Sequence, residues 1–300
     1  MATEKIKQPT IKDHTIAQLR RAVQVYSNLD FAARVSMWLI VGIVLVAVFA
    51  DFVAPYEPTV PDYGASVQGP SIDHPMGTDL TGRDILSRVI HGTRISLLVG
   101  VVAVSIAVAL GVTIGSIAGY RGGYVDEVLM RGVDVMISFP SLILALALVG
   151  AVGASLQNII IVIAIVYTPQ YARLIRGDVL SVKEEEFVEA ARGTGLSELK
   201  VLWKHVIPNA FTPVFVQATF HVATAIIFEA SLSFLGLGVQ PPTPTWGVLI
   251  ADGRQYLPEG WWISTFPGLA IMFTVLAFNI FGDGLRDEID PQTETTQEGA

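Results

Sequence analysis

The chain has 300 residues, of which 52% are hydrophobic and only 15% are charged, and its net charge is −8. Soluble domains average about 25% charged residues, so this composition excludes an ordinary soluble protein and favours one integral membrane domain. The basic surface typical of nucleic-acid binding is missing. The lack of cysteine excludes disulfides, thiolate metal sites and cysteine nucleophiles.

A polar, helix-prone segment at residues 1–33 precedes the first apolar block at 34–54, and we expect this segment to be cytoplasmic. The block is too long for the core of a signal peptide, which indicates a first membrane span that stays in the protein. A bilayer core requires about 20 apolar residues per helix. The sequence therefore predicts an all-α, polytopic membrane protein with six transmembrane helices, the later ones at 95–118, 130–150, 157–173, 211–235 and 264–283.

Lysine and arginine are distributed unevenly between the two sides of these spans. Fifteen of the 19 belong to the terminal segments and to the loops around 119–129 and 174–210. The other four are Arg83, Arg88, Arg94 and Arg254. Because positively charged loops remain in the cytoplasm, both termini and these two loops are predicted to be cytoplasmic. Trp261 and Trp262, on the external side, indicate an interfacial aromatic belt, with a docking face for a binding protein as the alternative.

Three ionisable residues fall inside the predicted spans, where each charge costs at least ~2.5 kcal/mol. Asp134 lies three residues after Arg131, which favours a structural ion pair on one helix face over a substrate role. Glu229 is expected to hydrogen-bond a neighbouring helix or to form a gating contact. We retain Asp134 and Glu229 as candidate pathway or gate residues. A lone interior histidine such as His221 is more often hydrogen-bonded than bound to metal.

The predicted cytoplasmic loop at 174–210 is much longer than the about 2 to 8 residues that connect helices in a bundle. Residues 183–191 predict a helix, and a glycine turn at 193–195 ends it. Residues 196–203 predict a second helix, which should stop before Pro208. Such a helical pair can insert into a groove of a cytoplasmic partner. A hairpin that merely folds back on the bundle fits the pattern equally well.

Within this loop stand Glu189-Ala190-Ala191, then Gly195, and later a His-Val-Ile-Pro-Asn sequence from residue 205. The first part resembles the EAA loop of ABC importer permeases. The second part is similar to the His-Ile-Leu-Pro-Asn form found in the dipeptide, oligopeptide and nickel branch of that family. Further segments similar to the C-type subunit of this branch cover nearly the whole chain, at residues 74–96, 122–141, 229–247 and 282–287.

The resemblance implies a type I ABC importer permease fold. Its parts would be the first transmembrane helix with an external loop at 34–94, a core transmembrane domain at 95–283 and a cytoplasmic acidic tail at 284–300. It also implies a location in the cell membrane and several partners: lipid, a second homologous permease, two ATP-binding subunits and an extracytoplasmic solute-binding protein. Together the two permeases would form a pathway for di- or oligopeptides, with nickel left open.

The resemblance further implies that the coupling to the ATP-binding subunit runs through Glu189, Ala190, Ala191 and Gly195. The chain itself contains no Gly-x-x-x-x-Gly-Lys-[Ser/Thr] phosphate loop and no hydrolase or zinc motif. We therefore expect it to be no enzyme and to bind no cofactor, with ATP and Mg on the partner subunits.

Two other classes of protein are possible. A proton-coupled secondary transporter would use Asp134 or Glu229 as a proton relay, but the inverted repeats and broken helices typical of such folds are not visible in the sequence. A membrane scaffold would need no partner ATPase. The secondary transporter would leave the long cytoplasmic loop unexplained.

Overall fold

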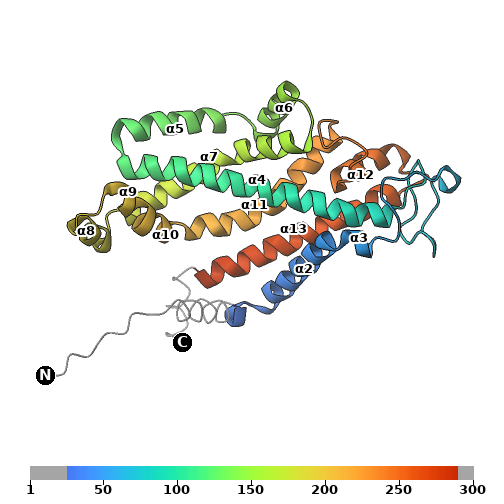
Figure 1. Cartoon of the computed structure of the whole chain (residues 1–300), viewed down its shortest axis with the longest axis horizontal. Helices are drawn as coiled ribbons and strands as arrows, with labels where there is room; N and C mark the ends of the chain where they lie inside the picture. Colours follow the sequence, from blue (N-terminus) through green and yellow to red (C-terminus); the bar gives the residue numbers. More distant parts are fainter. Residues whose placement is uncertain (1–25, 290–300) are drawn as a thin grey trace.

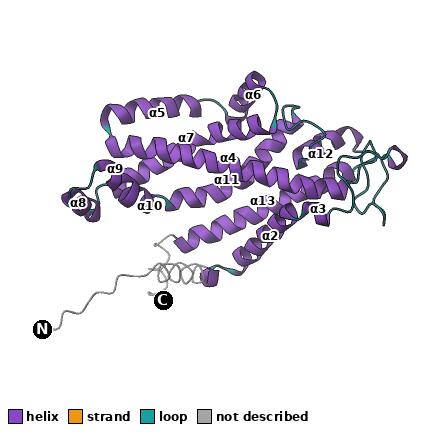
Figure 2. Ribbon diagram, in the orientation of Figure 1, coloured by secondary structure: helices purple, strands orange, loops and turns teal. Residues whose placement is uncertain are grey.

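The computed structural model describes residues 26–289, and within this part of the chain the fold consists of helices, turns and loops without any strand (Figures 1 and 2). The predicted all-α class is confirmed. The N-terminal segment up to residue 25 and the acidic tail from residue 290 lie outside the described residues. The elements are α2 Phe31–Val48, α3 Ala50–Val53, α4 Ile85–Arg121, α5 Gly123–Ile137, α6 Ser141–Val152, α7 Leu156–Val182, α8 Glu186–Gly193, α9 Glu198–Val201, a π-helical turn Leu202–Val206, α10 Ile207–Ala210, α11 Thr212–Phe234, α12 Trp246–Gly253 and α13 Trp262–Ile289, with short 3-10 turns at Tyr63–Ala65 and Arg254–Tyr256.

Five of the described helices, α2, α4, α7, α11 and α13, are long and apolar enough to cross a membrane. The remaining predicted span, the third in chain order at 130–150, is divided between α5 and α6, which meet at an angle of 91°. The count of six holds if this bent pair is one span. The break occurs at Pro140, which has no N–H for a continuing helix and which forces the residue before it out of the helical conformation.

Several predicted span boundaries fall within continuous helices, and those at 95 and 173 differ most from the helix ends. The 37 residues of α4 extend about 55 Å, and the helix begins well before residue 95. The Asp84 side chain caps it by accepting a hydrogen bond from the backbone N–H of Ser87 at 2.7 Å. Likewise, α7 continues beyond residue 173 to Val182, with Pro169 inside it. The polar residues at these ends therefore belong to helices that extend past the apolar blocks.

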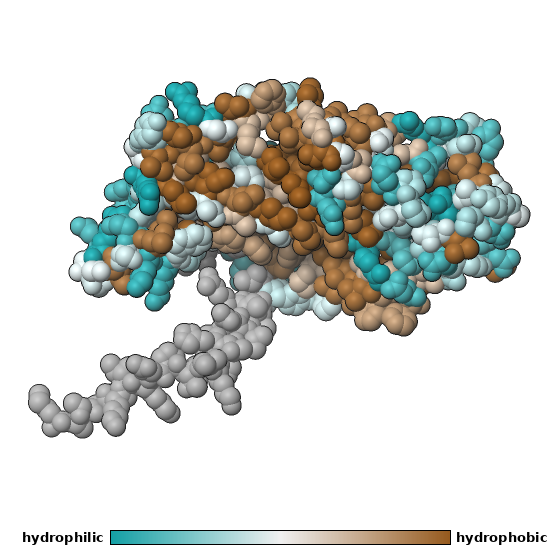
Figure 3. Space-filling model, turned by 45° about the horizontal axis from the view of Figure 1, so that its top comes forward, coloured by the Kyte–Doolittle hydropathy of each residue, from teal (hydrophilic) through white to brown (hydrophobic). Residues whose placement is uncertain are grey.

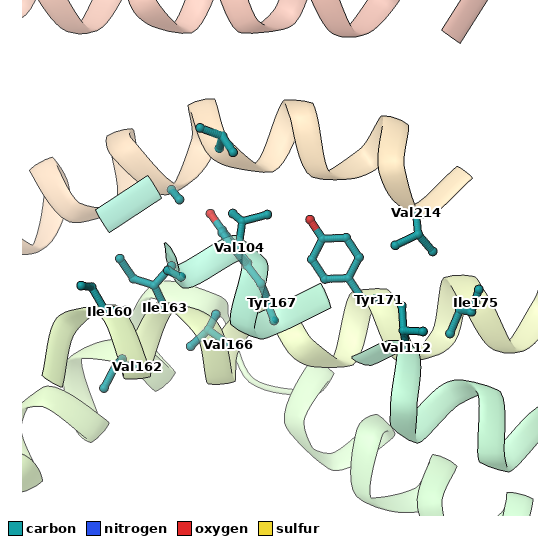
Figure 4. Packing of buried hydrophobic residues seen from close by; sticks show 14 of the residues in the cluster. Val104, Val112, Ile160, Val162, Ile163, Val166, Tyr167, Tyr171, Ile175 and Val214 are labelled. Carbon is teal, nitrogen blue, oxygen red and sulfur yellow. The ribbon is translucent and has the colours of Figure 1, made fainter. Parts of the chain in front are cut away.

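The contact between α4 and α7 forms the centre of the bundle. Gly111, Gly115 and Gly119 recur every four residues and so share the face of α4 that touches α7. A Cβ atom at Gly115 would lie 2.1 Å from the carbonyl oxygen of Ala172, so only glycine permits the two backbones to approach this closely. Tyr171 and branched aliphatic side chains fill the space beside this contact (Figure 4).

Polar loops and short helices occupy the two ends of the elongated bundle. We call them the α8 end, which contains α8, α9 and α10, and the α12 end, which contains α12 and the loop between α3 and α4 (Figure 1). In the space-filling view, hydrophobic residues gather between two hydrophilic ends (Figure 3). This distribution matches a molecule whose middle lies in lipid and whose ends lie in water.

Candidate functional site

The helix–turn–helix predicted in the 174–210 loop forms the α8 end. In α8, acidic residues lie in the first turn and Arg192 in the last, which complements the helix dipole. Val188 and Ala191 are buried against the bundle, whereas Glu189 and Ala190 are exposed. The four candidate coupling residues therefore differ in role: Ala191 packs inward, and Glu189 and Ala190 face solvent.

Gly195 forms the turn between α8 and α9. Its φ of 81° lies in the left-handed region that side chains with a Cβ atom disfavour. Space is not the reason for the glycine, because no atom lies within 4 Å of a Cβ built there. After α9 the helical path continues through the π-helical turn into α10, so the expected stop before Pro208 is wrong. Pro208 lies in the first turn of α10, where a missing N–H is tolerated.

The helical pair and the π-helical turn after it expose three large apolar side chains, which we call the apolar patch: Phe187 is 44% exposed, Leu199 63% and Trp203 48%. Exposed carboxylates, including that of Glu189, occur in the same segment. An apolar surface with a charged rim is typical of helices that insert into a groove of a partner protein.

A cluster of polar side chains attaches the helical pair to the C-terminal end of α4. The Tyr120 hydroxyl donates a hydrogen bond to the carboxylate of Glu198 and accepts one from Arg192 Nε at 3.4 Å. The guanidinium of Arg192 lies 5.3 Å from the centre of the Tyr120 ring, a cation–π distance. The hydrogen bond to Tyr120 raises the pKa of Arg192, which stays charged. Lys183 adds a second attachment, because its Nζ donates to the carbonyl oxygen of Gly119 at 3.0 Å.

Asp134 does not pair with Arg131, so that prediction is wrong. Its carboxylate instead accepts a hydrogen bond at 2.6 Å from Arg173 on α7. Arg131 turns toward Glu127, one helical turn back, with 3.9 Å between the charged groups. Helix periodicity places both Glu127 and Asp134 within reach of Arg131 and does not choose between them. It carries no information about Arg173, which belongs to a neighbouring helix.

Glu229 is fully buried near the end of α11. Its Oε1 accepts hydrogen bonds from Ser233 at 2.8 Å and from Thr245, the N-cap residue of α12, at 3.0 Å. The expected hydrogen bond to a neighbouring helix is confirmed. Oε2 has no hydrogen-bond partner. An open pocket of about 460 Å³, lined partly by Ser233, Asp252 and Arg254, lies at this end of the molecule.

His221 is a hydrogen-bonded interior histidine, as predicted. Its ring nitrogens lie 2.8 Å from the Tyr171 hydroxyl and 2.9 Å from the Gln217 amide nitrogen. The Tyr167 ring stacks on it with 4.8 Å between ring centres. Within residues 26–289, no group of three or more His, Cys, Asp or Glu side chains is arranged to hold a metal ion.

A buried ionic network organises the α12 end. Arg88, whose side chain is 1% exposed, pairs with the carboxylate of Asp79, which also accepts a hydrogen bond from Arg83 Nε at 2.7 Å. Burial acts to raise the pKa of Asp79, but the charges of Arg88 and Arg83 outweigh burial and hold this pKa below its usual value. Asp252 lies on the other side of Arg88, with 3.9 Å between the charged groups. The loop between α3 and α4 is therefore part of a folded cap.

The two tryptophans before α13 have different surroundings. Trp262 is only 8% exposed, and its indole N–H donates to the carbonyl oxygen of Thr78 at 3.0 Å. For this residue, the expected belt and the alternative docking face are both wrong. Trp261 remains 49% exposed. Trp246 is 2% exposed, and its indole N–H donates to the carbonyl oxygen of Val89 at 3.1 Å. This hydrogen bond holds α12 against α4.

These observations define a multi-pass helical membrane protein with a folded cap at one end and a projecting helical pair at the other. The family model described as the binding-protein-dependent transport system inner membrane component matches residues 111–295. The N-terminal transmembrane domain of oligopeptide transport permease C matches residues 32–70. The chain belongs to the binding-protein-dependent transport system inner membrane component family, the permeases of ABC importers.

Curated relatives align with most of the chain. The dipeptide transport system permease protein DppC of Alkalihalophilus pseudofirmus is 44% identical over 263 residues, which are 88% of this chain and 86% of the relative. The glutathione transport system permease protein GsiD of Escherichia coli is 44% identical over 254 residues, 84% of each chain. A probable D,D-dipeptide transport system permease protein, DdpC of Escherichia coli, is 42% identical over 85% of each chain.

Solved structures confirm the predicted fold of a type I ABC importer permease. A chain of the MetNI methionine ABC transporter in an inward-facing conformation superposes with a TM-score of 0.56 and 18% sequence identity. The superposition covers 69% of this chain and 98% of that chain. A second crystal form gives a TM-score of 0.55 and 19% identity.

Proposed function

We propose that this permease forms half of the pathway by which an ATP-driven importer carries di- or oligopeptides across the cell membrane. The relatives that support this substrate class are named for dipeptides and for glutathione, itself a tripeptide. A solute-binding protein delivers the substrate to the α12 end, and a second, homologous permease completes the pathway.

In this proposal the α8 end and both termini face the cytoplasm. The support is the excess of Lys and Arg in the segments assigned to that side. ATP and Mg bind to two separate ATP-binding subunits. The absence of a phosphate loop from the sequence agrees with this division of labour.

The patch of Phe187, Leu199 and Trp203 inserts into a groove on the ATP-binding subunit, with the exposed carboxylate of Glu189 at its edge. ATP-driven closure of the two ATP-binding subunits then displaces the helical pair. Gly195 gives the pair its fixed turn, so that the displacement moves the attached helices and exposes the pathway alternately to each side. The exposure of this apolar patch at a polar end of the bundle is the single observation that carries the proposal.

The test combines Glu189→Arg with Gly195→Pro in the complete transporter. The first change reverses a charge at the edge of the patch, and the second is incompatible with a φ of 81°. We expect the variant to insert into membranes but to lose co-purification with the ATP-binding subunit and ATP-dependent peptide uptake. Glu259→Arg, an equal charge reversal at an exposed position of the α12 end, is the matched control and should retain the ATP-binding subunit.

If the double variant retains both the ATP-binding subunit and uptake at the wild-type level, the helical pair is not the coupling element. A secondary transporter that uses Asp134 or Glu229 as a relay would then be the better description, and uptake should follow a proton gradient in the absence of ATP.

A further inference from the structure

We propose that Tyr120, Arg192 and Glu198 form a clamp that makes the α8–α9 pair move as one body with α4. This inference rests on the proposed function, since it concerns how motion of the helical pair reaches the rest of the permease. It assigns Tyr120 as a positioning residue for coupling, although Tyr120 lies outside the 174–210 loop.

The clamp joins parts of the chain that are far apart in sequence. Tyr120 is the penultimate residue of α4, while Arg192 and Glu198 lie on either side of the α8–α9 turn. One hydroxyl group contacts both: it donates to the carboxylate of Glu198 and accepts from Arg192. The two charged groups are themselves 3.8 Å apart, and the guanidinium also lies over the Tyr120 ring. The turn is therefore held from both sides by a single side chain.

The helical pair has a second connection to the same body. It follows α7 directly in the chain, and Lys183 at the end of α7 binds the carbonyl oxygen of Gly119. The close backbone contact at Gly111, Gly115 and Gly119 leaves α4 and α7 no room to slide across each other. With the clamp in place, the α8–α9 pair is attached to α4 and α7 at two points: before α8, where the chain leaves α7, and at the turn between α8 and α9.

At its other end α4 contacts the elements beside Glu229. Trp246 at the start of α12 hydrogen-bonds the carbonyl oxygen of Val89, and its backbone N–H lies 3.3 Å from Ser96 Oγ. Thr245, the residue before it, donates to Glu229. A displacement imposed on the clamp therefore reaches the cap contact at Val89, about 46 Å away, through one continuous helix.

Without the Tyr120 hydroxyl, the turn would keep its covalent link to α7 and the stacking of Arg192 on the ring, but it would lose both of its hydrogen bonds to α4. Force on the α8–α9 pair would then be absorbed in part by movement at the turn. We thus expect the loss to lower transport per ATP hydrolysed, with little effect on assembly.

The first test is Tyr120→Phe in the complete transporter, reconstituted in proteoliposomes with its binding protein and a dipeptide. The change removes one hydroxyl and keeps the ring beneath Arg192. We expect normal assembly, normal basal ATP hydrolysis and at least about fivefold less uptake per ATP, the factor that corresponds to about 1 kcal/mol for one of the two hydrogen bonds lost. Tyr124→Phe is the control with the same chemistry, because Tyr124 is 81% exposed at the start of α5, and it should leave this ratio unchanged.

The second test measures the motion itself. Because this chain contains no cysteine, Arg121→Cys and Lys200→Cys can carry two spin labels without background labelling of the permease, and the partner subunits are prepared without cysteine. Lys200 is an exposed residue of α9 outside the apolar patch. With Tyr120 present, the distance between the labels should stay constant between the nucleotide-free and ATP-bound states. With Tyr120→Phe, it should broaden or change with nucleotide.

A nucleotide-dependent distance with Tyr120 intact, or a Tyr120→Phe transporter with wild-type uptake per ATP, would overturn the clamp. If Tyr120→Phe fails to assemble, the labelled pair in the Tyr120 background still decides the question. Failure of the proposed function looks different, since the unmodified transporter would then show no ATP-dependent peptide uptake.

Discussion

The substitution Gly115→Ala tests how tightly the central helix pair is packed. The added methyl group would lie 2.1 Å from the carbonyl oxygen of Ala172 and 2.6 Å from Cγ2 of Ile175. Real Cβ contacts shorter than 3.0 Å essentially do not occur, so α4 and α7 must separate by about 0.9 Å at this point. The obstacle is partly backbone, which cannot turn aside as a long side chain can.

Overpacking of this kind costs about 1 to 3 kcal/mol. A glycine in a helix with open space around it behaves in the opposite way, because replacement by alanine stabilises the helix by up to about 1 kcal/mol. Gly132 in α5 and Gly42 in α2 have no atom within 4 Å of the added Cβ. The difference in free energy of unfolding between Gly115→Ala and these two controls is therefore expected to be about 2 to 4 kcal/mol.

Thermal unfolding of the purified permease, followed by tryptophan fluorescence, measures this difference. For a chain of this size about 1 kcal/mol shifts the midpoint by roughly 2 to 4 °C, so Gly115→Ala should unfold at least about 4 °C below both controls. Equal midpoints for Gly115→Ala and Gly132→Ala would refute the claim that the glycine face is needed for close packing. The rigid α4–α7 body required by the clamp would then lose its main support.

The cap and the buried carboxylate of α11 give two further predictions. Because Arg88 helps to hold the pKa of Asp79 below its ordinary value of 3.8, ionised Asp79 stabilises the folded cap above pH 3.8. This contribution is lost as the pH falls through the lowered pKa. The difference in unfolding midpoint between wild type and Asp79→Asn should therefore shrink in acid. Glu229→Gln retains an acceptor for the Thr245 hydroxyl and should alter the unfolding midpoint little. Glu229→Ala leaves buried hydroxyl groups unpaired and creates a void, so it should lower the free energy of unfolding by about 2 to 4 kcal/mol.

Local chemistry in the sequence was sufficient to predict the spans and the turn of the α8 end. The apolar blocks coincide with helices because lipid requires the backbone to satisfy its own hydrogen bonds. Gly195 was predicted to form a turn that requires a positive φ, and its φ of 81° confirms this prediction. The division of the third block at Pro140 could not have been predicted from the proline alone, because Pro169 and Pro267 lie inside the continuous helices α7 and α13.

The features that the sequence did not predict depend on partners distant in the chain. The first turns of α4 contain several charged residues and resemble a loop, but Arg88 is neutralised by a buried carboxylate from the preceding loop. The indole of Trp262 binds a carbonyl group 184 residues away. Tyr120 falls in the predicted loop at 119–129 and was not singled out, because its partner Glu198 is separated from it by 78 residues. Periodicity and hydropathy describe one helix at a time and carry no information on such pairs.

The exposed ion pair between α5 and α7 indicates what must cover that face of the bundle. Asp134 and Arg173 have side chains that are 55% and 56% exposed, and both belong to helices of the membrane region. Arg173 ends an apolar block on the side predicted to be cytoplasmic, so the pair lies toward that end of the membrane region and not at its centre. Ionisable residues of membrane spans mostly face the bundle interior or a water-filled cavity, so we expect this face to border water or polar groups of another subunit. Both surroundings are what a half-pathway completed by a second permease provides, and Asp134 therefore remains a candidate for the pathway even though its charge is already paired.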